Sequence, residues 1–125
     1  MARLIAHLAG DYIVQTSWMA SEKTYRSAPA AAHAAAYTAC FLPITRDWRR
    51  LSVIGTTHFA IDRWRLARHV TWAKNQLAPK AYRPDHTPTG YGDDIPPWLA
   101  FALLILADNA IHLLINELAL REKSS

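Results

Sequence analysis

The sequence contains a single cysteine and only four glycines among its 125 residues. One cysteine cannot form a disulfide within the chain, and Cys40 lies in the apolar run AAYTACFLPIT, so we interpret it as a buried, unreactive thiol. So few glycines, together with a hydrophobic fraction of 51%, exclude collagen and argue against a disordered chain. Glycine-rich phosphate-binding loops and the arrangements of serine or cysteine nucleophile triads are also missing.

The length favours one domain, which we take to cover residues 1–125. The chain opens with MARLIAHLAG, which holds one basic residue followed by a short apolar stretch. Asp11 interrupts that stretch before it reaches the length of a signal-peptide core, and no small-residue cleavage pattern stands out. We therefore predict no cleaved signal peptide.

Apolar residues are concentrated in four blocks, which predict an all-α protein built as a four-helix bundle. The first predicted helix covers residues 3–22 approximately, and the second, rich in alanine, covers about 29–44. The third begins near residue 49 or 51 and continues to about 77, with Gly55 and the two threonines after it as its weakest point.

The last predicted helix, from about residue 97 to 120, is apolar on nearly all sides. Before it, residues 78–97 contain five of the seven prolines and two of the four glycines, which predicts a long Pro/Gly-rich loop. A loop of that length in a compact domain is typically either functional or loosely ordered.

The apolar lengths of the same four blocks bear on membrane association. The last block has the ~20 apolar residues that cross a bilayer, the second is slightly short, and the other two are too polar to insert alone. Lysines and arginines, 14 against 10 acidic residues, collect at nearly every junction, so loop charge assigns no orientation. We favour membrane association slightly over a soluble, cytoplasmic bundle.

The basic clusters have several explanations. They suit anionic lipid or a phosphate-bearing substrate, although any solvated face beside an apolar helix looks the same. The basic and aromatic segment DRWRLARHVTWAK contains no recognisable nucleic-acid-binding module, so nucleic acid is disfavoured as a partner. The oligomeric state stays open.

Three of the four predicted helices contain a histidine and an aspartate four residues apart, and the second contains a lone histidine. Residues four apart lie on one helical face, so each pair can offer an imidazole and a carboxylate to one point. Facing helices of a bundle build metal sites in this way. We predict a divalent metal centre, zinc or another transition metal, with one or two ions. The predicted ligands are His7, Asp11, His33, His58, Asp62, Asp108 and His112.

A network without metal is the structural alternative. Aspartate is almost never fully buried without a partner, so Asp62 and Asp108 need compensation within their apolar helices. Hydrogen bonds between the histidines and aspartates could supply that compensation without an ion. We favour the metal because three such His–Asp pairs in one chain are harder to explain as a purely structural network than a single pair would be.

Three further residues lie on or near the same faces. Gln15 continues the stripe of the first pair and Asn116 that of the last, so both can orient ligands or bind substrate, while capping or interhelical hydrogen bonding explains them equally well. Arg65 follows Asp62 by three residues and could meet an anionic substrate, although a solvated position is commoner for arginine.

With the segments HLAGDYIVQTSWMASEK, HFAIDRWRLARHVTWAKNQL and DNAIHLLIN in view, the sequence resembles the domain of unknown function 3307 family over nearly its whole length. The resemblance implies a small, helical, membrane-associated protein of bacteria or their phages, with no settled activity. In ligand style alone, the chain is more distantly similar to membrane-bound metal-dependent hydrolases. The positions that match the family pattern are His7, Gly10, Asp11, Gln15, His33, His58, Asp62, Asp108 and His112.

The predicted function is metal-dependent hydrolysis, with a phosphoester as the substrate that suits the surrounding arginines. A metal lowers the pKa of bound water toward neutrality, and Asp11, Asp62 or Asp108 would accept the proton as the catalytic base. The alternative is a non-enzymatic, membrane-associated accessory protein of a phage or bacterium whose buried histidines and aspartates are structural.

Overall fold

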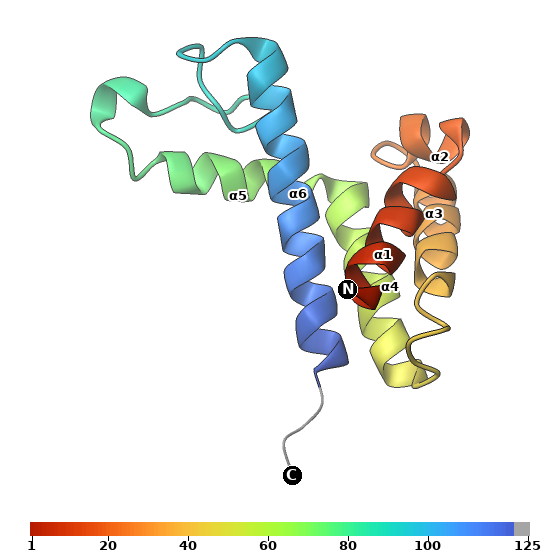
Figure 1. Cartoon of the computed structure of the whole chain (residues 1–125). Coiled ribbons are helices and arrows are strands. Elements are labelled where there is room, and N and C mark those ends of the chain that lie inside the picture. Colours follow the sequence, from red (N-terminus) through yellow and green to blue (C-terminus); the bar gives the residue numbers. More distant parts are fainter. Residues whose placement is uncertain (122–125) are drawn as a thin grey trace. The chain divides into compact units, whose positions relative to one another are not determined.

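A computed structural model describes residues 1–121, and within that range the chain forms helices and no strands (Figure 1). The all-α prediction is confirmed. The chain divides into two compact units, one combining Met1–Trp64 with the residues from His112, the other spanning Arg65–Ile111. The candidate site lies in the first unit.

The prediction of one continuous first helix over residues 3–22 is wrong. The segment consists of α1 (Ala2–Leu8), the π-helix η1 (Ala9–Ile13) and α2 (Ser17–Glu22). The break arises because Thr16 caps the start of α2: its hydroxyl accepts a hydrogen bond from the Met19 amide at 3.3 Å. A capping threonine has extended backbone geometry, which a continuous helix cannot accommodate.

Helices α3 (Ser27–Ala39) and α4 (Trp48–Trp64) pack closely together. Helix α3 ends at Ala39, before the predicted end at residue 44, and turns follow. Gly55, which we predicted as a weak point, lies inside α4, where an added Cβ would approach Thr38 Oγ1 on α3 to 2.7 Å. The glycine therefore serves the close packing of two helices rather than a break.

The predicted third helix does break, but at Arg65 rather than near Gly55. Arg65 has a φ of 51°, in the left-handed region, which cannot continue a right-handed helix. Helix α5 (Leu66–Asn75) begins after it, followed by the short 3₁₀ helix η2 (Lys80–Tyr82). The segment after η2 is attached to α5: Thr71 donates a hydrogen bond to the carbonyl of Thr89 at 2.6 Å.

The last predicted helix is confirmed as α6 (Pro97–Leu120). Over its most apolar 18-residue window the mean hydropathy is 2.0, and 17% of that window is buried. Within residues 1–121, this helix alone is long and apolar enough to cross a membrane.

The core of the first unit lies beside the site. It contains Tyr37, Phe41 and Ile54, all fully buried, and the end of α6 at Leu120. Two arginines hold that helix end: Arg3 donates to the Leu120 carbonyl at 3.1 Å and Arg50 at 3.4 Å. Cations suit the carbonyls at a helix C-terminus. These contacts keep the final turns of α6 against the core.

Candidate metal centre

Five acidic and imidazole side chains from four elements converge in the first unit. The π-helix η1 supplies Asp11, α3 supplies His33, α4 supplies His58 and Asp62 one turn apart, and α6 supplies His112. Their side chains are at most 11% exposed. The site is therefore buried, and every charged group in it needs a partner of opposite charge. For the carboxylates that partner can be a metal cation.

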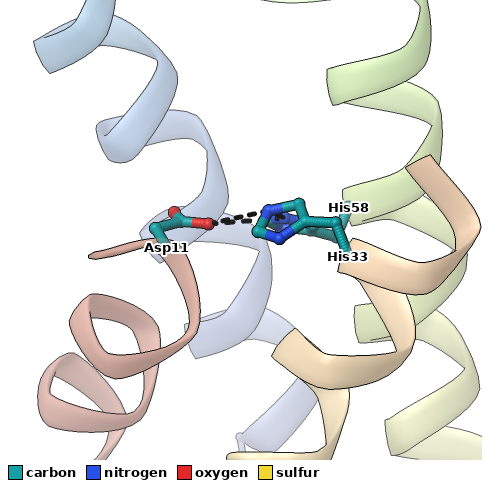
Figure 2. A group of neighbouring side chains, drawn as sticks. All are labelled: Asp11, His33 and His58. Atoms are coloured by element: carbon teal, nitrogen blue, oxygen red, sulfur yellow. Dashed lines mark hydrogen bonds and ion pairs between the residues drawn. The ribbon is translucent and has the colours of Figure 1, made fainter. Parts of the chain in front are cut away.

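Four potential ligand atoms of this cluster are linked by five short separations. The Nε2 atoms of His33 and His58 lie 2.9 Å apart, and Asp62 Oδ2 lies 3.2 Å from each of them. Asp11 Oδ1 lies 3.3 Å from His33 Nε2 and 3.4 Å from His58 Nε2 (Figure 2). Ligands placed tetrahedrally around zinc at its usual bond lengths are separated by about 3.3 Å. Asp11 Oδ1 and the two Nε2 atoms therefore have the spacing of ligands that share one ion.

Two groups in the cluster could hold a metal ion. One contains Asp11, His33 and His58, and the other contains His58, Asp62 and His112. His112 Nε2 lies 3.4 Å from Asp62 Oδ1, the oxygen turned away from the four-atom cluster. Both groups need His58, and a single imidazole nitrogen has one lone pair and binds one ion. The geometry therefore favours one ion at a time through His58 Nε2.

The imidazole rings of His33 and His58 are oriented through Nε2. Their Nδ1 atoms are buried and have no hydrogen-bond partner within residues 1–121. If the ring protons reside on Nδ1, two nitrogen lone pairs face each other and two carboxylates, all of which are acceptors. Such a group of acceptors could hold a cation.

The pKa values follow from the same contacts. Burial acts to raise the pKa of Asp11, but the hydrogen bond with His33 and the charges of the other histidines hold it below its usual value. Asp62 behaves in the same way: its contacts with three histidines outweigh burial and lower its pKa. Both carboxylates are therefore ionised at neutral pH.

The two central histidines shift in opposite directions. Burial acts to lower the pKa of His33, but hydrogen bonds with Asp11 and Asp62 raise it above its usual value. Burial dominates for His58 and lowers its pKa, so its neutral, metal-binding form is favoured.

Lys23 is a member of the site that the sequence did not single out. Its Nζ lies 2.8 Å from Asp62 Oδ2 and 3.3 Å from His33 Nε2. In the sequence this lysine is one of the basic residues that collect at the junctions between apolar blocks. Its place at the end of the segment HLAGDYIVQTSWMASEK was the available signal, because that segment also holds the first His–Asp pair.

Tyr37 is the second residue that sequence reasoning missed. Its ring stacks on His58, with centroids 3.7 Å apart and planes 16° apart. Its hydroxyl contacts His7 Nδ1 at 2.7 Å and accepts a hydrogen bond from Asn116 Nδ2 at 2.6 Å. His7 and Asn116, predicted as a ligand and an orienting residue, thus both meet at a tyrosine that packs against the cluster.

Three remaining predicted residues lie outside both groups. Asp108 is half-buried on α6, one turn before His112. Gln15 lies between η1 and α2 and is half-buried. Arg65 starts the second unit, where its guanidinium donates to the Pro88 carbonyl at 3.4 Å. Their proposed roles stay predictions.

The fold and the site together define a small all-helical protein with a buried histidine and aspartate cluster that could hold a metal ion. Residues 1–86 match the family described as protein of unknown function (DUF3307), and the chain belongs to this family. The matched range includes Asp11, Lys23, His33, His58 and Asp62, and it ends before α6.

Comparison with curated proteins and with solved structures gave no match. The more distant similarity to membrane-bound hydrolases stays a prediction, because neither the family nor the fold bears on it.

Proposed function

We propose that this protein is a metal-dependent hydrolase that binds one zinc ion through Asp11, His33 and His58. The observation that carries the proposal is the set of five separations, from 2.9 to 3.4 Å, among the four ligand atoms of these residues and Asp62. Carboxylate and imidazole ligands without cysteine suit zinc and also other divalent transition metals.

The role of Asp62 separates a catalytic site from a structural one. Catalytic zinc keeps three protein ligands and leaves one position to water, whereas four protein ligands close the site. We assign three residues to the ion and Asp62 to the bound water, which it orients and whose proton it accepts. Asp62 Oδ2 lies 3.2 Å from the Nε2 atoms of His33 and His58, which would place it within reach of a water bound beside them.

A phosphoester is the proposed substrate class. The chain has an excess of basic residues, 14 against 10 acidic ones, which favours anionic substrates. Among the residues around the four ligand atoms, Asp11 and Lys23 have the more exposed side chains, at 11% and 18%. The Lys23 ammonium thus offers positive charge to a small anionic group near solvent.

The test measures metal content and hydrolysis in the same preparations. The full chain, purified without chelator, should contain about one zinc per chain by elemental analysis and should hydrolyse phosphomonoester or phosphodiester reporters. Asp62→Asn should retain zinc and lose turnover by about 100-fold or more. Asp85→Asn, at an exposed position in the other unit, serves as the matched control.

The outcomes separate the alternatives. Loss of zinc from Asp62→Asn would show a closed, four-ligand structural site and would contradict catalysis. Stoichiometric zinc in the wild type without turnover on a broad panel of phosphoesters and lipids would contradict the hydrolase as well. An absence of bound metal would contradict the metal centre itself.

A second candidate is a membrane-associated, non-enzymatic accessory protein whose cluster stabilises the fold. The apolar length of α6 supports this candidate, and so do large exposed side chains along it, including Phe101, Leu106 and Leu114. It predicts that the full chain sediments with membranes after an alkaline carbonate wash. It also predicts that His58→Ala destabilises folding without any separate loss of turnover.

A further inference from the structure

Lys23 occupies an unusual position for a lysine. It follows α2 at the edge of the cluster, and its Nζ contacts Asp62 Oδ2 at 2.8 Å and His33 Nε2 at 3.3 Å. The lysine side chain is 18% exposed, whereas the Asp62 side chain is 4% exposed. A buried carboxylate is thus paired with a cation that reaches in from the border of the site.

The charges of the site make this pairing necessary in the absence of metal. The Asp11 and Asp62 carboxylates both contact His33 and His58 and are at most 11% exposed, and unpaired charge in such a buried space is expensive. Of the lysines and arginines within residues 1–121, Lys23 is the one whose nitrogen lies within 4 Å of either carboxylate. Its ammonium supplies positive charge where the bound ion would otherwise supply it.

Lysine and metal ion compete for the space beside His33 Nε2. His33 is one of the three proposed ligands, and a bound ion lies about 2 Å from its Nε2. An ammonium 3.3 Å from that nitrogen would then be no more than about 5.3 Å from the ion. Two cations at that separation in a buried site repel each other strongly.

We propose that Lys23 is a built-in substitute for the metal ion: it neutralises Asp62 in the metal-free protein and moves out when the ion binds. The inference rests on the metal centre of the proposed function. The lysine stem is flexible and already reaches solvent, so the ammonium can leave without unfolding α2. Metal binding must break the Lys23–Asp62 ion pair, and this cost lowers the affinity of the site for the metal ion.

The test titrates zinc into chelator-treated full-length protein by calorimetry and compares the wild type with Lys23→Met and Lys23→Gln. Both variants should bind zinc about tenfold more tightly or better, since the competing cation is gone. Without zinc, both variants should unfold at a lower urea concentration than the wild type. With zinc bound, the variants and the wild type should unfold at the same urea concentration. Lys74→Met is the control, because Lys74 donates to the Tyr91 hydroxyl in the other unit.

Each other result is decisive. Unchanged or weaker zinc binding in both Lys23 variants would overturn the proposal that Lys23 stands in for the ion. The lysine would then have no effect on zinc binding or would support the ligands. Failure of both variants to fold even with zinc would also overturn it, since the loaded protein should not need the lysine. If the wild type and both variants bind no zinc, the metal centre fails and the inference with it.

Discussion

His33 Nε2 and His58 Nε2 lie 2.9 Å apart, although 25 residues separate these histidines along the chain. Each nitrogen also lies within 3.4 Å of Asp11 and Asp62. One shared proton can join only two of these atoms. Lys23 Nζ, 2.8 Å from Asp62 Oδ2, supplies positive charge to one carboxylate, and the proposed divalent ion would bring Asp11 together with the two histidines.

Removal of the metal should destabilise the wild-type protein. A ligand that binds only the folded state adds about 2.7 kcal/mol when present at 100 times its dissociation constant. We expect a chelator to lower the thermal midpoint of the wild type and added zinc to restore it. His33→Ala and His58→Ala should be insensitive to both additions in differential scanning fluorimetry.

His69→Ala is the matched control for those two variants, because His69 is exposed on α5 and lies in the other unit. It should respond to chelator and zinc as the wild type does. A thermal midpoint of the wild type that ignores both additions would contradict a metal contribution to stability.

Tyr37→Phe should destabilise the fold by about 1–3 kcal/mol while zinc stoichiometry is maintained. The change removes a buried hydroxyl that contacts His7 and Asn116, and it leaves the ring that stacks on His58. Urea unfolding measures the loss. Tyr91→Phe, whose hydroxyl accepts from Lys74 at a more exposed position, should change the stability by less than about 0.5 kcal/mol. Equal effects of the two changes would refute the structural role of Tyr37.

Gly10→Ala should cost about 1–3 kcal/mol through overpacking. An added Cβ at Gly10 would lie 2.4 Å from the buried ring of Tyr37, which cannot retreat because it is packed against His58. Gly92→Ala is the comparison, since the tight contact of its added Cβ would be with the end of the flexible Asp94 side chain, and its contact with Pro84 would be an ordinary one at 3.6 Å. Thermal unfolding of the two variants should differ clearly, and similar midpoints would show that Tyr37 adapts.

The metal-free protein should lose stability on acidification below about pH 4. The pKa values of Asp11 and Asp62 are lower in the folded protein than their ordinary value of 3.8. Such groups contribute stability that is present above 3.8 and disappears as the pH falls toward their folded pKa values. Urea unfolding with chelator, from pH 7 to about pH 3, should show a weaker acid dependence for Asp62→Asn. Parallel curves for the two proteins would count against an ion-paired Asp62.

The four-residue spacing of histidine and aspartate predicted part of the site correctly. His58 and Asp62 are four residues apart, α4 is continuous between them, and both side chains reach the cluster. His7 and Asp11 have the same spacing, but the π-helix η1 begins between them. His7 Nδ1 still lies 3.5 Å from Asp11 Oδ2, but it also contacts the Tyr37 hydroxyl at 2.7 Å, while the other oxygen of Asp11 contacts His33 and His58.

The sequence by itself determined that the protein is helical, that α6 is apolar throughout, and that histidines and aspartates share helical faces, because all three are periodic or compositional properties. The tertiary structure decided which faces meet. It brought Lys23 and Tyr37 to the cluster, and it ended α4 at Trp64, just before the left-handed backbone of Arg65. These features depend on contacts between residues distant in sequence or on a single backbone conformation, and neither leaves a pattern along the chain.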